Sequence, residues 1–405
     1  MLRSVQQNTS SVSADLDEWL APFLKRFRVD PQRRWAPVYV RGLIAPGERK
    51  SVEPMADRVA PGQTQQLHHF VSTSQWPVEP IEEVLLQKAD ALVGGSDSHL
   101  IVDDTAIPKK GKHSAGVEHQ YCGQLGKQAS CQSLVSITLA KGDVPIPIAL
   151  RLFLPKSWDE DQVRRTRAGI PAYVRHRPKW QIALAEIRRI RSQNVRFGSV
   201  LADAGYGACA EFRHALTEMG LLWAVGISSE QLVYPRSVRV RAPVRGSRGR
   251  PAKHGTTTAQ RRSVREAIED LGARAFETIT WRRGTKGDLV ADFAATRIRV
   301  ADGAKATSRI HLPGDVVWLV CERRRGGEVK YHLTNHPETV DLHEIVATIK
   351  ARWSCEQAHQ QMKEELGLDH FEGRSWLGLH HHAVMTMVAF CYLQQRRLSE
   401  NKPSA

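Results

Sequence analysis

Residues 199–227 read SVLADAGYGACAEFRHALTEMGLLWAVGI, and this stretch decides the predicted fold. A short apolar run over 199–203 ends in Asp203, a helical pattern covers 210–219, and a second apolar run covers 221–227. Short apolar runs on either side of a helix are typical of buried parallel strands joined by a crossover helix. The stretch therefore predicts a strand–helix–strand unit with an aspartate at the end of its first strand.

The sequence before this unit predicts three strands and one helix. The strands cover residues 99–105, 133–140 and 144–154, and the helix covers residues 180–192. Three strands in succession suggest an antiparallel meander. Together with the unit above they give the order β-β-β-α-β-α-β, in which an antiparallel trio continues into parallel strands. The predicted fold class is therefore α/β, with a ribonuclease-H-like catalytic core.

Four segments of different character divide the chain. Helical patterning with Pro and Gly breaks predicts a helical N-terminal domain over residues 1–95, for which the resemblance described below implies DNA binding. The first part of the catalytic core follows over 96–235, and a basic, β-rich insertion over 236–335 interrupts it. C-terminal helices within 336–400 complete the core, beginning with one long helix over 342–366.

The charge of the chain points to a polyanionic partner. Its 405 residues include 58 Lys and Arg against 43 Asp and Glu, a formal net charge of +15. Basic and acidic residues are equal in number over 1–95, so the excess lies in the rest of the chain. Residues 236–262 carry many basic side chains and no acidic one. A nucleic acid is the expected partner.

Other protein classes are excluded by the same sequence. A hydrophobic fraction of 41% with 25% charged residues is typical of a globular protein. The longest apolar stretch, 383–393, is interrupted by Thr386 and is far shorter than the ~20 residues of a membrane span. No apolar segment follows Arg3, so no secretion signal is expected. We therefore expect a cytoplasmic protein that does not enter membranes.

Acidic residues end two of the predicted strands. Asp104, with Asp103 beside it, ends the first strand, and Asp203 ends the fourth. These two strands are neighbours in a ribonuclease-H-like sheet, so their carboxylates can share a metal ion. Phosphodiester chemistry commonly uses two divalent cations ~4 Å apart, and Mg²⁺ prefers carboxylate oxygens. The alternative interpretation is that both aspartates only form turns at strand ends.

Glu356 is the candidate for a third carboxylate, supplied by a helix that docks on the sheet. On one continuous helix, Arg352, Glu356 and Lys363 lie within about 40° of one another, and His359 falls on the same face, where we expect it to contact DNA near the scissile strand. The two cations are suited to clamp flanking phosphates. The alternatives are a solvated ion pair between Arg352 and Glu356 and a surface position for His359.

Three stretches of the sequence carry a resemblance to a known family. They are LIVDDTAIPKKGKHSAGV followed by QYCGQLGKQASCQ, then VLADAGYG, then RWSCEQAHQQMKEELGLDHFEGRSW with an R-x₃-E-x₆-K pattern. The chain resembles the DDE transposases of bacterial insertion sequences, in the branch with a β-strand insertion between the second Asp and the Glu. The likeness covers most of residues 60–380. Ile349 stands where this helix signature usually has a Tyr.

The resemblance implies a catalytic and metal-binding set of Asp104, Asp203 and Glu356, with two Mg²⁺ ions for which Mn²⁺ can substitute. Asp104 is chosen over Asp103 because the Asp directly before Thr is the ligand in relatives. Only one of two neighbours in a strand can face the site. The implied phosphate contacts are Arg352 and Lys363.

The same resemblance implies the reaction and the partners. The protein would cleave transposon-end DNA and join the 3′-hydroxyl to target DNA. Its partners would be the double-stranded terminal repeats and target DNA, and a homodimer would form in the synaptic complex. We expect a nucleoid-associated location in a bacterial cytoplasm.

Further DNA contacts are expected at basic and aromatic positions. They are Lys109, Lys110 and Lys112 after the first acid, Arg248 and Arg250 in the basic loop, and Trp281 in the insertion. The lysines would steer the phosphate backbone, the arginines resemble a minor-groove arm, and the indole would stack on a displaced base. The alternatives are a solvated turn, a generic flexible loop and a core tryptophan.

Two other functions stay open from the sequence alone. A catalytically inactive DNA-binding or regulatory derivative of a transposase would have the same charge and fold. A ribonuclease-H-type nuclease that cuts RNA in hybrids would use a similar core.

Overall fold

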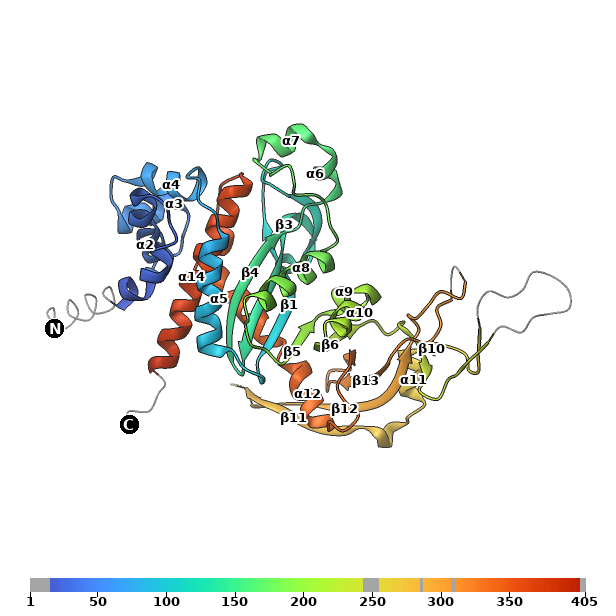
Figure 1. Cartoon of the computed structure of the whole chain (residues 1–405). Coiled ribbons are helices and arrows are strands. Elements are labelled where there is room, and N and C mark those ends of the chain that lie inside the picture. Colours follow the sequence, from blue (N-terminus) through green and yellow to red (C-terminus); the bar gives the residue numbers. More distant parts are fainter. Residues whose placement is uncertain (1–14, 243–254, 285–286, 308–309, 401–405) are drawn as a thin grey trace. The chain divides into compact units, whose positions relative to one another are not determined.

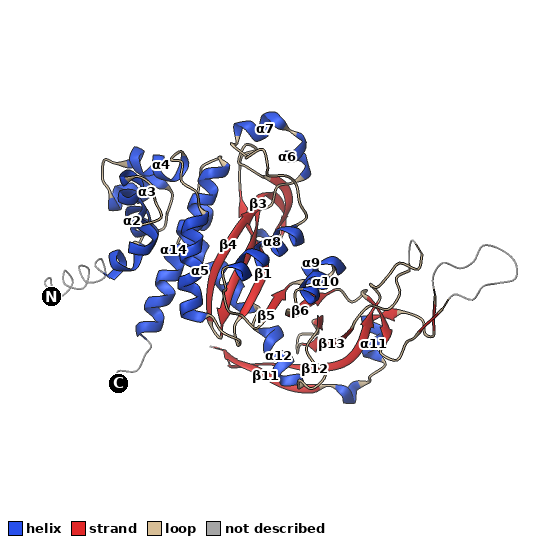
Figure 2. Ribbon diagram, viewed as in Figure 1, coloured by secondary structure: helices blue, strands red, loops and turns tan. Residues whose placement is uncertain are grey.

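The computed structural model describes residues 15–242, 255–284, 287–307 and 310–400 (Figure 1). The chain divides into two compact units. The first unit contains the chain up to Gly198 and from Trp353 onward, and the second unit contains Ser199–Arg352. Both units combine helices with strands (Figure 2), so the predicted α/β class is confirmed. Arg248 and Arg250 lie outside the described residues.

The sheet of the first unit is antiparallel and is built around one long strand. Its strands are β1 (His99–Pro108), β2 (Glu118–Cys122), β3 (Lys127–Lys141) and β4 (Val144–Leu152). β1 pairs along one edge of β3, while β2 and β4 pair in succession along the other edge. The predicted meander is confirmed. The short, half-exposed β2 was not predicted, because it lacks a continuous apolar run.

Helices surround this sheet. They are α2 (Asp30–Ile44), α3 (Val52–Val59), α4 (Thr64–Ser72), α5 (Glu79–Val93), α6 (Lys156–Glu160), α7 (Gln162–Arg167), α8 (Lys179–Ser192), α13 (Trp353–Glu364) and α14 (Trp376–Glu400). α14 packs on α2, α4, α5 and β4 (Figure 1), and its apolar segment is buried as the sequence predicts. No helix among the described residues has both the length and the apolar character of a membrane span.

The second unit begins with the strand–helix–strand unit predicted from residues 199–227. β5 (Ser199–Ala202) and β6 (Leu222–Ile227) pair in parallel, and α10 (Ala210–Glu218) crosses between them. These three elements are confirmed. A one-turn helix, α9 (Ala204–Gly207), follows β5 directly and was not predicted, because its Gly-rich sequence has no helical periodicity.

The rest of the second unit is rich in antiparallel strands. They are β7 (Leu232–Pro235), β8 (Val240–Arg241), β9 (Thr256–Thr257), β10 (Arg262–Ser263), β11 (Glu277–Gly284), β12 (Gly287–Val300), β13 (Val316–Arg323) and β14 (Val329–Thr334). From β5 the sheet order is β5-β6-β14-β13-β12-β7-β10, with β11 also on β12 and with β8 and β9 as a separate pair. Since β5 and β6 are parallel, the sheet is mixed. α11 (Val264–Glu269) and α12 (Leu342–Lys350) complete this unit.

The prediction of a single long helix over 342–366 is wrong. The chain forms α12 and α13 there, separated by a turn at residues 351 and 352. α12 buries Ile345 and Val346 in the second unit, whereas α13 buries Ala358 and Met362 in the first. The break follows because the two apolar faces belong to different cores. Arg352 therefore lies before α13 and not on it.

Candidate active site

The two neighbouring acids of β1 face different helices. Consecutive side chains of a strand point to opposite faces of the sheet. The thiol of Cys355 on α13 donates to Asp103 Oδ2 at 3.3 Å. Lys179 Nζ at the start of α8 donates to Asp104 Oδ2 at 2.5 Å. Asp103 therefore shares a face with α13, and Asp104 shares the opposite face with α8.

A second contact fixes α13 on the Asp103 face. Ser136 of β3 is the register partner of Asp103. Its hydroxyl and His359 Nε2 lie 2.6 Å apart in a buried hydrogen bond. His359 is only 7% exposed, so it packs on the sheet and does not present its imidazole at the surface.

Glu356 leaves this helix–sheet interface. It directly follows the buried Cys355, and a helix turns about 100° per residue, so its side chain lies on the flank of α13 and is exposed. Glu356 is thus one position from the thiol that contacts Asp103. The sequence analysis favoured Asp104 as the first acid. Asp103, however, lies on the face of the sheet that α13 covers, and this position favours Asp103. Cys355 and Lys179, which reveal the two faces, have no sequence signal of their own.

Asp203 is held by the turn that follows β5. As the N-cap of α9, its Oδ1 accepts hydrogen bonds from the backbone N–H of Gly205 at 3.0 Å and of Tyr206 at 3.2 Å. The turn packs so tightly on β6 that a Cβ on Gly207 would lie 1.9 Å from the carbonyl oxygen of Gly226. The strand-end turn and the candidate catalytic role therefore coexist at Asp203, because capping uses one carboxylate oxygen.

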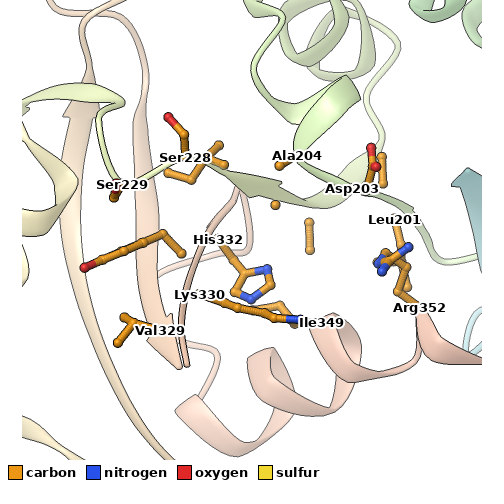
Figure 3. A pocket seen from close by; sticks show the side chains of 15 residues that line it. Leu201, Asp203, Ala204, Ser228, Ser229, Val329, Lys330, His332, Ile349 and Arg352 are labelled. Atoms are coloured by element: carbon orange, nitrogen blue, oxygen red, sulfur yellow. The ribbon is translucent and has the colours of Figure 1, made fainter. Parts of the chain in front are cut away.

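A cavity of about 450 Å³ lies beside Asp203 within the second unit (Figure 3). Arg352 lines it below Asp203, and His332 and Lys330 of β14 line its floor. Ser228, after β6, lines the far end. Its cationic side chains, Lys330 and Arg352, suit this cavity to an anionic ligand.

A buried ion network supports the floor of this cavity. Glu322 is 1% exposed and lies 2.8 Å from Lys350 Nζ, 2.6 Å from Arg324 Nε and 3.7 Å from His332 Nε2. Burial alone would raise the pKa of Glu322, but hydrogen bonds from Lys350 and Arg324, together with the nearby His332, hold it well below its ordinary value. Burial lowers the pKa of His332. The carboxylate therefore stays charged and fixes β13 to β14 and α12.

The indole of Trp281 is already engaged within the second unit. Lys350 Nζ lies 4.1 Å from its ring centroid, and Phe293 meets it edge-on at 5.9 Å. The ring is half-buried on β11. Its surroundings resemble the core alternative, although part of the ring remains accessible.

The lysines expected to contact DNA differ in exposure. Lys110 and Lys112 are exposed. Lys109 donates to the carbonyl of Phe371, and burial lowers its pKa to about 8. Lys363, in the last turn of α13, is half-buried, and burial lowers its pKa. Lys110 and Lys112 are therefore the two best placed to meet a phosphate backbone.

Within the ranges that the structure describes, no three His, Cys, Asp or Glu side chains gather into a group that could hold a metal ion. The candidate acids nevertheless offer the donor chemistry that Mg²⁺ prefers. Their ligating atoms are carboxylate oxygens, without thiolate or imidazole in the set.

Comparisons with known proteins include a curated relative and a solved structure. The relative is the probable transposase for insertion sequence element IS701 of Microchaete diplosiphon, 30% identical over 193 residues, which are 47% of this chain and 48% of that protein. The chain thus spans about half the length of the curated relative that it matches. The solved structure is a cryo-EM structure of the piggyBac transposase synaptic complex with hairpin DNA. It aligns at a TM-score of 0.45 and 9% identity, covering 98% of this chain and 75% of that chain.

A family profile gives the broader assignment. The profile of the DDE superfamily endonucleases matches residues 22–288. The match includes Asp103, Asp104 and Asp203 and ends before Glu356. It covers more than half of the chain and confirms the family that the sequence motifs indicated. The chain belongs to the DDE superfamily of endonucleases.

Proposed function

We propose that this protein is a transposase that cleaves transposon-end DNA and joins the freed 3′-hydroxyl to target DNA. Membership of a DNA-cleaving superfamily and similarity to a probable insertion-sequence transposase support this activity. The net charge of +15 supports a DNA partner. The proposed partners are double-stranded terminal repeats and target DNA, bound by a homodimer on the bacterial nucleoid.

The proposed catalytic acids are Asp103, Asp203 and Glu356, with Asp103 in place of the Asp104 that the sequence favoured. The contact between Cys355 and Asp103 carries this choice. It brings the first turn of α13, which holds Glu356, to the face of β1 that Asp103 occupies. Asp104 instead forms a half-exposed ion pair with Lys179.

These acids would hold two Mg²⁺ ions, with Mn²⁺ as a substitute. When bound, the ions supply Lewis-acid stabilisation of the attacking and leaving oxygens. The chain itself orients one oxygen of Asp203 through the N-cap of α9. Lys110, Lys112, Arg352 and Lys363 neutralise the DNA phosphates on either side of the scissile bond.

We further propose that the catalytic core is ribonuclease-H-like and that the β-rich segment from β7 to β14 is an insertion in it. The antiparallel trio β1–β3–β4 and the parallel pair β5–β6 are the elements that such a core requires. The N-terminal helices would bind DNA, as would Arg248 and Arg250. Trp281 would stack on a displaced base with the part of its ring that Lys350 leaves accessible.

A nicking assay tests the proposed function. Purified protein is incubated with Mg²⁺ and a labelled duplex containing the DNA that flanks its gene, and strand ends are mapped. We expect cleavage at the element ends that EDTA abolishes. A wild-type protein that binds this duplex without nicking would indicate an inactive regulatory derivative. Cleavage of the RNA strand of any hybrid, regardless of DNA ends, would indicate a ribonuclease.

A further inference from the structure

A second cavity, in the first unit, lies apart from the candidate acids. Its volume is about 860 Å³. Six parts of the chain supply its walls: Arg28 before α2, the segment before α5, the end of β4, the loop over 171–177, α8, and the first turns of α14. Neither Asp103, Asp104 nor Glu356 lines it.

The floor of this cavity is a closed ion network. Arg151 donates to both oxygens of Glu82 at 2.6 Å and to Glu186 at 2.9 Å, and Arg189 Nε donates to Glu186 at 2.9 Å. Burial alone would raise the pKa of Glu186, but Arg151 and Arg189 lower it. Two arginines and two carboxylates therefore neutralise one another, and the floor has no charge left for a ligand.

The rim carries an excess of positive charge, because three arginines line it against one exposed acid, Glu79. Arg28 and Arg177 are exposed, and neither has an ion-pair partner among the described residues. Arg175 lies 3.5 Å from Asp159, which Arg165 already binds at 2.8 Å. Such a rim attracts an anion with several charges.

Aromatic side chains complete the cavity. The side chain of Tyr173 is 83% exposed, on the same loop as Arg175 and Arg177. Trp376 is half-buried and lies 4.2 Å from His380, ring centroid to ring centroid. A tyrosine this exposed beside an apolar cavity favours a ligand with a flat apolar surface.

We infer that this cavity binds a single-stranded segment of nucleic acid, with phosphates on Arg28 and Arg177 and a base against Tyr173 and Trp376. Cationic rims combined with aromatic platforms are the usual means of binding single strands without strong sequence preference. In a duplex the bases are stacked inside the helix, so they cannot reach the aromatic side chains. This inference does not depend on the proposed cleavage activity.

Fluorescence anisotropy tests the inference on the full chain in EDTA. The probes are a labelled single strand of about 10 nucleotides, the same sequence as a duplex, and an abasic single strand. We expect Tyr173→Ala and Arg177→Ala each to weaken single-strand binding about tenfold. Duplex binding of both variants should change less than twofold. The abasic strand should bind the wild-type protein as weakly as the intact strand binds Tyr173→Ala.

Arg188→Ala is the matched control, because Arg188 is exposed on α8 and does not line the cavity. Since Tyr173, Arg177 and Arg188 are all exposed, the variants should fold normally, which circular dichroism checks. Unchanged single-strand affinity in Tyr173→Ala and Arg177→Ala, or an equal loss with Arg188→Ala, would overturn the inference. The inference would also be overturned if an acidic peptide bound at this cavity and the intact single strand did not displace it.

Discussion

Asp103 and Asp104 are adjacent on β1 but bind partners on opposite faces of the sheet, Asp103 accepting from Cys355 and Asp104 from Lys179. Adjacent strand positions necessarily diverge in this way. Only one of the two can lie on the face that α13 covers.

This divergence predicts different effects for two isosteric substitutions. Asp103→Asn should reduce Mg²⁺-dependent nicking by at least a hundredfold, about 3 kcal/mol of transition-state stabilisation, because a metal ligand is lost. Asp104→Asn is the matched control and should stay within a few-fold of wild type. Initial rates on the same labelled duplex measure both, and the reverse order would restore Asp104 as the first acid.

The tight packing at Gly207 predicts that an added methyl group there destabilises the turn that holds Asp203. Because a Cβ there would lie 1.9 Å from the carbonyl oxygen of Gly226, Gly207→Ala must displace α9 from β6. We expect a loss of about 2 kcal/mol or more in the free energy of unfolding, measured by urea denaturation. Gly326→Ala is the control, since a Cβ on Gly326 meets nothing within 4 Å. Equal stability of the two variants would show that the turn can relax.

The Glu322 network predicts a large effect on stability. Glu322→Ala leaves Lys350 and Arg324 without their buried carboxylate, which should cost about 3 kcal/mol. Glu328→Ala removes a 52% exposed partner of Arg324 and should cost less than about 1 kcal/mol. Denaturant titrations of the two variants compare these losses. Similar values would mean that burial adds little to the network.

The burial of neutral His382 predicts that the folded protein loses stability in acid. His382 donates from Nε2 to the Gly367 carbonyl at 3.0 Å and accepts at Nδ1 from the Tyr39 hydroxyl at 2.8 Å, so its neutral form is satisfied. Burial lowers its pKa to about 4, whereas the unfolded chain binds the proton near its ordinary value of 6.5. Stability is therefore full above pH 6.5 and falls as the pH drops toward 4.

The loss from His382 should reach about 3 kcal/mol. Denaturant midpoints measured at several pH values between 7 and 4 give the slope. His382→Gln should reduce this slope without abolishing it, because burial also lowers the pKa of His380 and His381 to about 4. A slope unchanged by the substitution would exclude His382 as a source of the acid sensitivity.

Substitutions of His359 and Lys110 should have opposite effects: the first should lower stability and keep DNA binding, and the second should keep stability and weaken DNA binding. His359→Ala removes a buried hydrogen bond to Ser136 and should lower the free energy of unfolding by about 2 kcal/mol, with duplex affinity kept under native conditions. Lys110→Ala removes an exposed cation and should weaken duplex binding while leaving stability unchanged. Salt-dependent anisotropy and urea denaturation separate them. Weakened binding in fully folded His359→Ala would return His359 to the DNA contacts.

The sequence predicted most of the strands and helices that position the candidate acids. Residues 199–227 have apolar runs at strand length and a helical pattern between them, so local periodicity alone was enough. The same period-2 rule stated that Asp103 and Asp104 must diverge. It could not tell which face would receive α13, because that depends on packing between segments far apart in the chain.

The break between α12 and α13 escaped prediction for a similar reason. No Gly or Pro marks residues 351 and 352, and helical periodicity continues through them. The helix ends there because Ile349 and Cys355 are buried in different units. His359 was expected to face the DNA because the prediction assumed a single helix with Arg352, Glu356 and Lys363 on the same face.

The buried thiol of Cys355, between α13 and β1, can report how often α13 separates from the sheet. Cys355 has no exposed surface, so iodoacetamide can modify it only when α13 lifts from the sheet. Its alkylation rate, followed by mass spectrometry, thus measures how often the helix carrying Glu356 detaches, and no cysteine has to be engineered into the chain.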